Sequence, residues 1–279
     1  SRIIENYAQV VVEDDPETKK KSVKQIFPRY HQLDCVEKLL ADVKANGVGK
    51  RYLIQHSAGS GKSNSIAWLA HQLIGLEKDG HPMIDSVLVV TDRRILDKQI
   101  RDNIKQFMQV ANTVAWAEHS GDLRKAIQAG KRIIITTVEK FPYVVPDIGA
   151  ARKTNHFAVI IDEAHSGQNG RNSAQMNLAL SGLASEGEMD NEDKINAMME
   201  GRKLLPNASY FAFTATPKNK TLETFGTLVV DENGNPVLNE DGEAQHRPFH
   251  SYTMKQAIQE GFILDVLKYY TPISSYYKL

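Results

Sequence analysis

Short, uniformly apolar runs recur along the chain from residue 25 onward. They lie at Tyr52–Gln55, Val87–Thr91, Ile133–Thr137, Phe157–Asp162 and Tyr210–Thr214. Runs of this length that lack polar alternation are typical of strands buried on both faces of a parallel sheet. The hydrophobic pattern therefore predicts a central, mainly parallel β-sheet.

Amphipathic segments separate these runs. Ser63–Ile74 forms one apolar stripe at helical spacing and is followed by Gly75, and Asp97–Met108 repeats the pattern. A further helix is expected at His31–Val43, before the first strand. Alternating strands and helices predict βαβ units and hence a doubly wound α/β fold.

Three segments depart from this rhythm. Residues 1–24 carry opposed blocks of acidic and basic residues with a proline, which indicates a polar, solvated linker, with a specific DNA contact as the alternative. Residues 181–202 are polar and are interpreted as a surface insertion that contains a helix. Residues 229–248 contain a strong turn signal at Asp231–Pro236, which predicts an exposed hairpin.

Composition adds little to this picture. The chain has 279 residues, with 34 Lys and Arg balancing 34 Asp and Glu, so a DNA site would have to be a local patch on a neutral body. With a single cysteine, Cys35, the chain cannot form an internal disulfide, which fits a reducing cytoplasm. Cys35 is interpreted as a buried residue that fills space in the core. No apolar run reaches the roughly 18 residues of a membrane span and no signal peptide is evident, so we expect no membrane partner.

Residues 56–63 read His-Ser-Ala-Gly-Ser-Gly-Lys-Ser between a predicted strand and a predicted helix. This is the context of a phosphate-binding loop, although His56 replaces the first glycine of the usual motif. Glycines allow consecutive N–H groups to face phosphate oxygens, and the following helix adds the positive end of its dipole. The residues assigned to the phosphates and to Mg²⁺ are Ser57, Ala58, Gly59, Ser60, Gly61, Lys62 and Ser63, with Lys62 at the β- and γ-phosphates and Ser63 at the metal ion.

ATP binding is also assigned to Arg29 and Gln32, in the segment Phe27–Gln32 that opens the first helix. A carboxamide both donates and accepts hydrogen bonds, which is the pattern that selects adenine. Gln32 is therefore predicted to read adenine, and the alternative is an ordinary surface residue of a helix.

Two further motifs follow apolar strands. Asp162 and Glu163 end one strand, where Asp162 is predicted to hold Mg²⁺ and Glu163 to orient or deprotonate the attacking water. His165 is predicted to relay between the γ-phosphate and a coupling strand, or alternatively to cap the turn. The sequence Thr214-Ala215-Thr216 ends that coupling strand, and its hydroxyls are expected to change partners when the γ-phosphate is lost.

Together, these motifs resemble the first RecA-like lobe of superfamily 2 helicases and translocases over residues 25–225. Five segments narrow the resemblance to the restriction (motor) subunit of type I restriction–modification enzymes: Phe27–Gln32, His56–Ser63, Val89–Arg94, Asp162–Ser166 and Met254–Leu264. The replacement at His56 fits this closer pattern.

The resemblance implies an activity and a set of partners. Such subunits join methyltransferase and specificity subunits in the cytoplasm of bacteria or archaea, hydrolyse ATP, translocate double-stranded DNA and cleave it. It also implies a first RecA-like motor domain at 25–228, a hairpin-like insertion at 229–248, and a helix with a connection toward a second lobe at 249–279. Neither a nuclease signature nor that second lobe is evident, so the segment is expected to be a fragment. Because the second lobe supplies an arginine finger, the fragment is expected to hydrolyse little ATP.

By the same resemblance, Thr91, Asp92, Arg93 and Arg94 are expected to contact the phosphates of DNA, as are Thr136, Thr137 and Lys140 in the next loop. Helix capping with solvated arginines is the alternative. Other functions also stay open: another superfamily 2 translocase, a small-molecule kinase, or a binding module without turnover.

Overall fold

The computed structural model describes residues 2–14, 21–91, 114–117, 121–138, 140–141, 155–162, 207–239 and 242–265. Its helices are α1 (Arg2–Asn6), α2 (Tyr30–Asn46), α3 (Lys62–Ile74), α5 (Asp122–Gln128), α9 (Asn219–Phe225) and α10 (Met254–Gln259). Its strands are β1 (Gln9–Asp14), β2 (Lys21–Ile26), β3 (Arg51–His56), β4 (Glu77–Lys78), β5 (His81–Pro82), β6 (Ser86–Thr91), β7 (Val114–Trp116), β8 (Ile133–Thr137), β9 (Phe157–Ile161), β10 (Ala208–Thr214), β11 (Thr227–Leu228), β12 (His246–Arg247) and β13 (His250–Tyr252).

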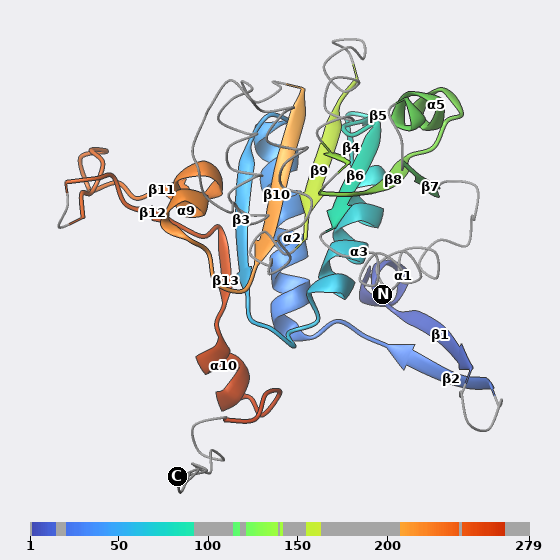
Figure 1. The fold of residues 1–279 in the computed structure, drawn as a ribbon, viewed down its shortest axis with the longest axis horizontal. Coiled ribbons are helices and arrows are strands. Elements are labelled where there is room, and N and C mark those ends of the chain that lie inside the picture. The colour runs from blue at the N-terminus through green and yellow to red at the C-terminus, as the bar shows by residue number, and fades with distance from the viewer. Residues whose placement is uncertain are drawn as a thin grey trace, which may run out of the picture.

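A seven-stranded sheet in the order β13-β3-β10-β9-β6-β8-β7 forms the centre of the molecule (Figure 1). Every pair of neighbouring strands in it is parallel. The predicted α/β fold with a parallel sheet is thus confirmed, and all five predicted runs are strands of this sheet. Two of its strands, β7 and β13, have only three residues each and were not predicted.

Helices cover both faces of the sheet. Alternate residues of β3 point to opposite faces, so that Ile54 packs with α2 and α3 on one face and Leu53 packs with α9 on the other. The apolar stripe predicted for Ser63–Ile74 is buried in the first of these cores, and the helix begins one residue earlier than predicted, at Lys62. The helix predicted at Asp97–Met108 and the insertion at 181–202 lie outside the described residues.

The prediction of a solvated linker at residues 1–24 is wrong for the described part of that segment. It forms α1 and an antiparallel β1–β2 hairpin that projects from the sheet at the lower right of Figure 1. Tyr7 is 1% exposed, its ring lies 6.0 Å from that of Trp68, and its carbonyl accepts a hydrogen bond from the Trp68 indole at 3.0 Å. This buried contact attaches the segment to α3. The charged residues that follow it led the sequence analysis to predict a linker.

Residues 227–239 and 242–247 leave the sheet as an exposed antiparallel excursion. β11 pairs with β12, and isolated bridges join Val230 to Pro236 and Leu238 to Ala244. Asp231 closes the first turn by accepting hydrogen bonds from the N–H groups of Asn233 and Asn235. Among the described residues, no helix has both the length and the apolar composition needed to cross a bilayer.

The buried contact of Tyr7 predicts the effect of removing its ring. Tyr7→Ala should lower the free energy of unfolding by about 3 kcal/mol, because it removes a buried aromatic ring. Urea unfolding of the chain measures this value. The control Ile4→Ala, in helix α1 just before Tyr7 but 62% exposed, should change this free energy by less than about 0.5 kcal/mol. Equal effects of the two substitutions would contradict the packing described for Tyr7.

Candidate functional site

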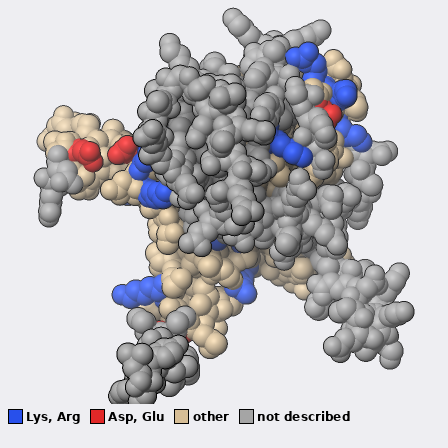
Figure 2. Space-filling model, in the orientation of Figure 1, with Lys and Arg blue, Asp and Glu red and all other residues tan. Residues whose placement is uncertain are grey.

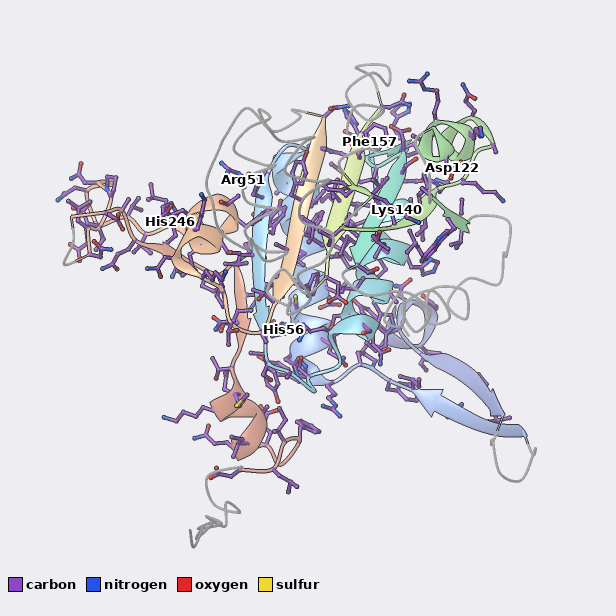
Figure 3. The ribbon with its side chains drawn as sticks, in the orientation of Figure 1. Arg51, His56, Asp122, Lys140, Phe157 and His246 are labelled. Atoms are coloured by element: carbon purple, nitrogen blue, oxygen red, sulfur yellow. The ribbon has the colours of Figure 1, made fainter. Side chains whose placement is uncertain are left out.

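Because the strands are parallel, the predicted motifs meet at one edge of the sheet, beyond the carboxyl ends of the strands. Figure 3 shows His56 at the lower end of β3, whereas Arg51 and Phe157 lie at the opposite, upper edge. From β3 across the sheet, the strands end in His56, Thr214, Ile161, Thr91 and Thr137. Asp162 directly follows β9, and its N–H donates to the Val90 carbonyl at 2.8 Å. One strand, β10, therefore separates the loop after β3 from Asp162.

The loop after β3 turns back on itself and enters α3. The Ser60 N–H donates to the Ser57 carbonyl at 3.2 Å, and Gly59 and Gly61 adopt positive φ angles of 74° and 81°. Such angles are accessible to glycine without strain. The Lys62 side chain is 8% exposed and donates to the His56 carbonyl at 3.4 Å, so that it folds back over the loop.

The first turn of α2 lies against this loop. Gln32 donates from Nε2 to the carbonyl of Ser60 at 3.3 Å and of Gly61 at 2.9 Å, while its Oε1 accepts from the Arg29 N–H at 2.8 Å. His31 Nε2 lies 2.9 Å from the Ser60 carbonyl. A Cβ on Gly61 would lie 2.6 Å from Gln32 Nε2, so this position requires glycine because of its φ angle and because of this neighbour.

The segment 249–265 covers the same loop from the other side. The Ser57 N–H donates to the Tyr252 carbonyl of β13 at 2.9 Å. Beyond α10, the Phe262 ring lies 4.0 Å from the Arg29 guanidinium, and Ile263 comes within 3.6 Å of the position that a Cβ would take on Gly59. The loop is thus held between α2 and a segment almost 200 residues later in the chain.

A buried hydrogen-bonded chain explains why histidine occupies position 56. His56 Nε2 lies 2.8 Å from His250 Nδ1, and His250 Nε2 lies 3.0 Å from Asp34 Oδ2. Although partial burial opposes it, hydrogen bonds from Lys38 and His250 lower the pKa of Asp34, so this carboxylate accepts. A glycine at position 56 would leave His250 Nδ1 without this partner.

The protonation of the chain follows from its acceptor. Because the Asp34 carboxylate accepts, His250 carries its proton on Nε2. Burial lowers the pKa of His250 and, to about 2, that of His56, so both rings are neutral at pH 7. His250 Nδ1 is then an acceptor, and His56 Nε2 is the donor.

Cys35 lies beside this chain. Its thiol, His56 and His250 offer ligand atoms within 4.8 Å of one another. Burial raises the pKa of the Cys35 thiol, which keeps it protonated, and the two facing ring nitrogens are already bonded to each other. The cluster is therefore explained by packing and hydrogen bonding.

The arrangement of the loop suits a polyphosphate. The hydroxyls of Ser57 and Ser60 are buried and have no hydrogen-bond partner within the described residues. Both hydroxyls, the Lys62 ammonium and the N-terminus of the 13-residue helix α3 surround one loop. Each of these groups favours an anion. The oxygens of Ser63 and Asp162 are of the kind that Mg²⁺ prefers.

The remaining predicted residues are only partly placed. Thr214 is buried at the end of β10, and Thr216, after Ala215, is exposed. Thr91 and Thr137 pair in register on adjacent strands, and each hydroxyl is buried without a partner within the described residues.

Lys140 follows in a turn, where its N–H donates to the Thr137 carbonyl at 3.0 Å. The Thr136 hydroxyl donates to the Ala117 carbonyl at 3.0 Å. Glu163, His165, Asp92, Arg93 and Arg94 lie outside the described residues. On the face shown in Figure 2, the basic side chains lie in separate places over different elements, among them α5 at the upper right.

Comparison with known proteins adds the family. A model of the SWI2/SNF2 ATPase matches residues 31–276, which is most of the chain and includes the loop at 56–63. The chain belongs to the SWI2/SNF2 ATPase family.

Its curated relatives are subunits of type I restriction enzymes. The chain is 25% identical over 240 residues to the SsaAORF53P endonuclease subunit of Staphylococcus saprophyticus, and 27% identical over 228 residues to the HindI endonuclease subunit of Haemophilus influenzae. These alignments cover 85% and 75% of the chain, but only 21% and 19% of the relatives. The chain therefore spans about a fifth of their length.

The solved structure of the ATP-dependent type ISP restriction–modification enzyme LlaBIII bound to DNA shares the fold. The TM-score is 0.53 at 14% sequence identity, over 90% of this chain and 17% of that one. A nuclease-deletion mutant of the type ISP enzyme LlaGI, in complex with a DNA substrate mimic, gives a TM-score of 0.50 at 15% identity, over 86% of this chain and 21% of that one.

Several residues of the site were not found from the sequence. His31 lies beside Gln32 on the same helical turn, and this adjacency was the available signal. His250 and Tyr252 offer none, because β13 is short and polar and its partners lie about 200 residues earlier.

The buried histidines of this site make the stability of the chain depend on pH. An unfolded histidine takes up a proton below about pH 6.5, whereas His56 stays neutral down to about pH 2. The free energy of unfolding should therefore fall as the pH falls through this range, by about 1.4 kcal/mol per pH unit for His56 alone. His31, His71 and His250, whose pKa values are also lowered, act in the same direction.

Urea unfolding at pH 7.5 and 5.5 tests this dependence. His56→Gln should reduce the loss of stability on acidification, whereas His81→Gln, at an exposed position of β5, should leave it unchanged. An equal loss in the chain and in both variants would contradict the neutral, buried state of His56.

Proposed function

We propose that this chain binds ATP with Mg²⁺ in the loop at 56–63 and forms the first motor lobe of a type I restriction endonuclease subunit. In that subunit, ATP hydrolysis drives the translocation of double-stranded DNA before cleavage. The observation that carries the proposal is a loop held between α2 and β13, whose buried hydroxyls have no hydrogen-bond partner among the described residues and lie one strand away from Asp162.

The ligating roles fall to the residues around this loop. Lys62 and the loop N–H groups bind the β- and γ-phosphates, while Ser63 and Asp162 hold the metal ion, which neutralises phosphate charge when bound. Glu163 orients or deprotonates the attacking water. His165 relays between the γ-phosphate and the coupling strand.

Coupling and DNA binding extend along the same edge. Thr214 and Thr216, with Ala215 between them, pass the loss of the γ-phosphate to the DNA side by changing hydrogen-bond partners. The residues proposed to contact DNA phosphates are Thr91, Arg93, Arg94, Thr137 and Lys140. Thr91 and Thr137 pair directly at adjacent strand ends. Such contacts position a duplex without reading its sequence.

The similarity to type I endonuclease subunits favours restriction over other translocases of the family. It points to a cytoplasmic complex with methyltransferase and specificity subunits. A second lobe that supplies an arginine finger would complete the ATPase site.

The first test addresses the phosphate loop. Lys62→Ala should abolish DNA-stimulated ATP hydrolysis by the protein that contains this chain, because the ammonium is lost from the phosphates. Steady-state release of phosphate in the presence of duplex DNA measures this. Lys78→Ala, on the exposed strand β4, is the matched control and should retain activity. Normal turnover in the Lys62 variant would refute the assignment of the loop.

The second test addresses the base. Gln32→Ala should weaken the binding of ATP more than that of GTP, because the carboxamide matches the hydrogen-bonding edge of adenine. Competition against a fluorescent nucleotide gives both dissociation constants, and Gln245→Ala, in the exposed excursion, is the control. An equal loss of affinity for both nucleotides would mean that Gln32 only holds the loop and does not read adenine.

A further inference from the structure

His31 contacts the loop at the point where its peptide groups turn toward α3. The ring is 2% exposed, and Nε2 lies 2.9 Å from the Ser60 carbonyl, which Gln32 also contacts. Because a carbonyl oxygen only accepts, the proton of His31 lies on Nε2. Burial lowers the pKa of His31, which makes this the neutral tautomer with a bare Nδ1. Nδ1 is buried and has no partner within the described residues.

The direction of these carbonyls fixes the direction of the next amides. In a planar trans peptide, the carbonyl of one residue and the N–H of the following residue point to opposite sides. When the Ser60 carbonyl faces α2, the Gly61 N–H faces away from α2. The Gly61 carbonyl accepts from Gln32 and from the Asn64 and Ser65 N–H groups of α3, and it directs the Lys62 N–H in the same manner. Adjacent N–H groups that converge in this way form an anion-binding nest.

β13 and α10 hold the His31 ring in place. The rings of His31 and Tyr252 stack with centroids 3.7 Å apart and an angle of 6° between their planes. The Tyr252 hydroxyl donates to Glu260 Oε2 at 2.7 Å. Burial and this hydrogen bond raise the pKa of Tyr252 to about 12, so the hydroxyl keeps its proton. The Tyr252 carbonyl also accepts from the Ser57 N–H, so one residue of β13 supports both ends of the turn.

We propose that His31 is a positioning residue of the ATPase site: its Nε2–H, held by the stack on Tyr252, orients the Ser60–Gly61 peptide so that the Gly61 N–H joins the Lys62 N–H in the phosphate nest. This inference rests on the proposed function, since it requires that the loop bind a polyphosphate. It assigns His31 to the phosphates rather than to the base, whereas Gln32, which also contacts the Ser60 and Gly61 carbonyls, is the proposed reader of adenine.

Three substitutions separate the hydrogen bond from the packing. His31→Phe keeps an aromatic ring on Tyr252 but removes the donor. His31→Gln restores an N–H at a similar reach. Tyr30→Ala, at a 77% exposed position on the same turn of α2, is the matched control. Each variant of the chain is titrated with ATP and, separately, with inorganic tripolyphosphate, which has no base, and its unfolding midpoint is measured without ligand.

His31→Phe should raise the dissociation constants for ATP and for tripolyphosphate by a similar factor, about tenfold, as expected for one buried hydrogen bond. His31→Gln should recover most of the affinity, and Tyr30→Ala should match the unsubstituted chain. Recovery by glutamine would show that the donor matters, since a purely structural role of the ring would not be rescued by a flexible amide.

Three results would overturn the inference. Unchanged affinity for both ligands in His31→Phe would mean that Gln32 alone orients the loop. A loss of affinity for ATP but not for tripolyphosphate would mean that His31 contributes to binding of the base and not of the phosphates. If His31→Phe does not fold, the folded His31→Gln variant decides the question. Tripolyphosphate binding by this variant that is clearly weaker than that of the unsubstituted chain would also overturn the inference. Two other results would refute the proposed function itself. The unsubstituted chain could bind neither ATP nor tripolyphosphate, or the Lys62→Ala variant could bind both ligands as tightly as the unsubstituted chain does.

Discussion

The parallel orientation of all strands in the central sheet is the constraint on which the rest of the structure depends. Each motif follows the carboxyl end of a strand, and in a parallel sheet those ends lie at a single edge. Residues as distant in sequence as His56, Asp162 and Thr214 are thereby brought to adjacent strand ends. The short strand β13 extends this edge beyond β3 and delivers His250 and Tyr252 to the loop. The sheet places the site, and the loops supply its chemistry.

Within this frame, the phosphate loop is shaped from outside. Its carbonyls are held by His31 and Gln32, its first N–H by Tyr252, and the strand residue before it by His250. Preorganised N–H groups bind an anion without the cost of turning the peptides at the moment of binding. Neutral imidazoles make two of these contacts, because burial lowers the pKa values of His31 and His250. The hydrogen bond between His56 and His250 accounts for a histidine where the usual motif has glycine.

The sequence predicted those parts of the molecule that depend on local pattern. The strands ending in His56, Thr91, Thr137 and Thr214 and the helix following the loop appear in the hydrophobic periodicity, and the loop appears in its glycines. The failures have a shared physical cause, because they depend on contacts between distant residues. β13 and β7 are too short to show a pattern. Tyr7 is buried by Trp68, 61 residues away, although its neighbours carry the charge blocks of a linker. The partner of His56 lies 194 residues away, and no local signal indicates it.

The central claim is that the loop at 56–63 is a phosphate nest held open by α2 and β13. A crystal structure of this chain with Mg²⁺ and a non-hydrolysable analogue of ATP tests it most directly. The account predicts phosphate oxygens at hydrogen-bond distance from the N–H groups of Gly61 and Lys62, with the Ser60 and Gly61 carbonyls still bonded to His31 and Gln32. A nucleotide bound elsewhere, or phosphates in a loop whose carbonyls have turned away from α2, would contradict it.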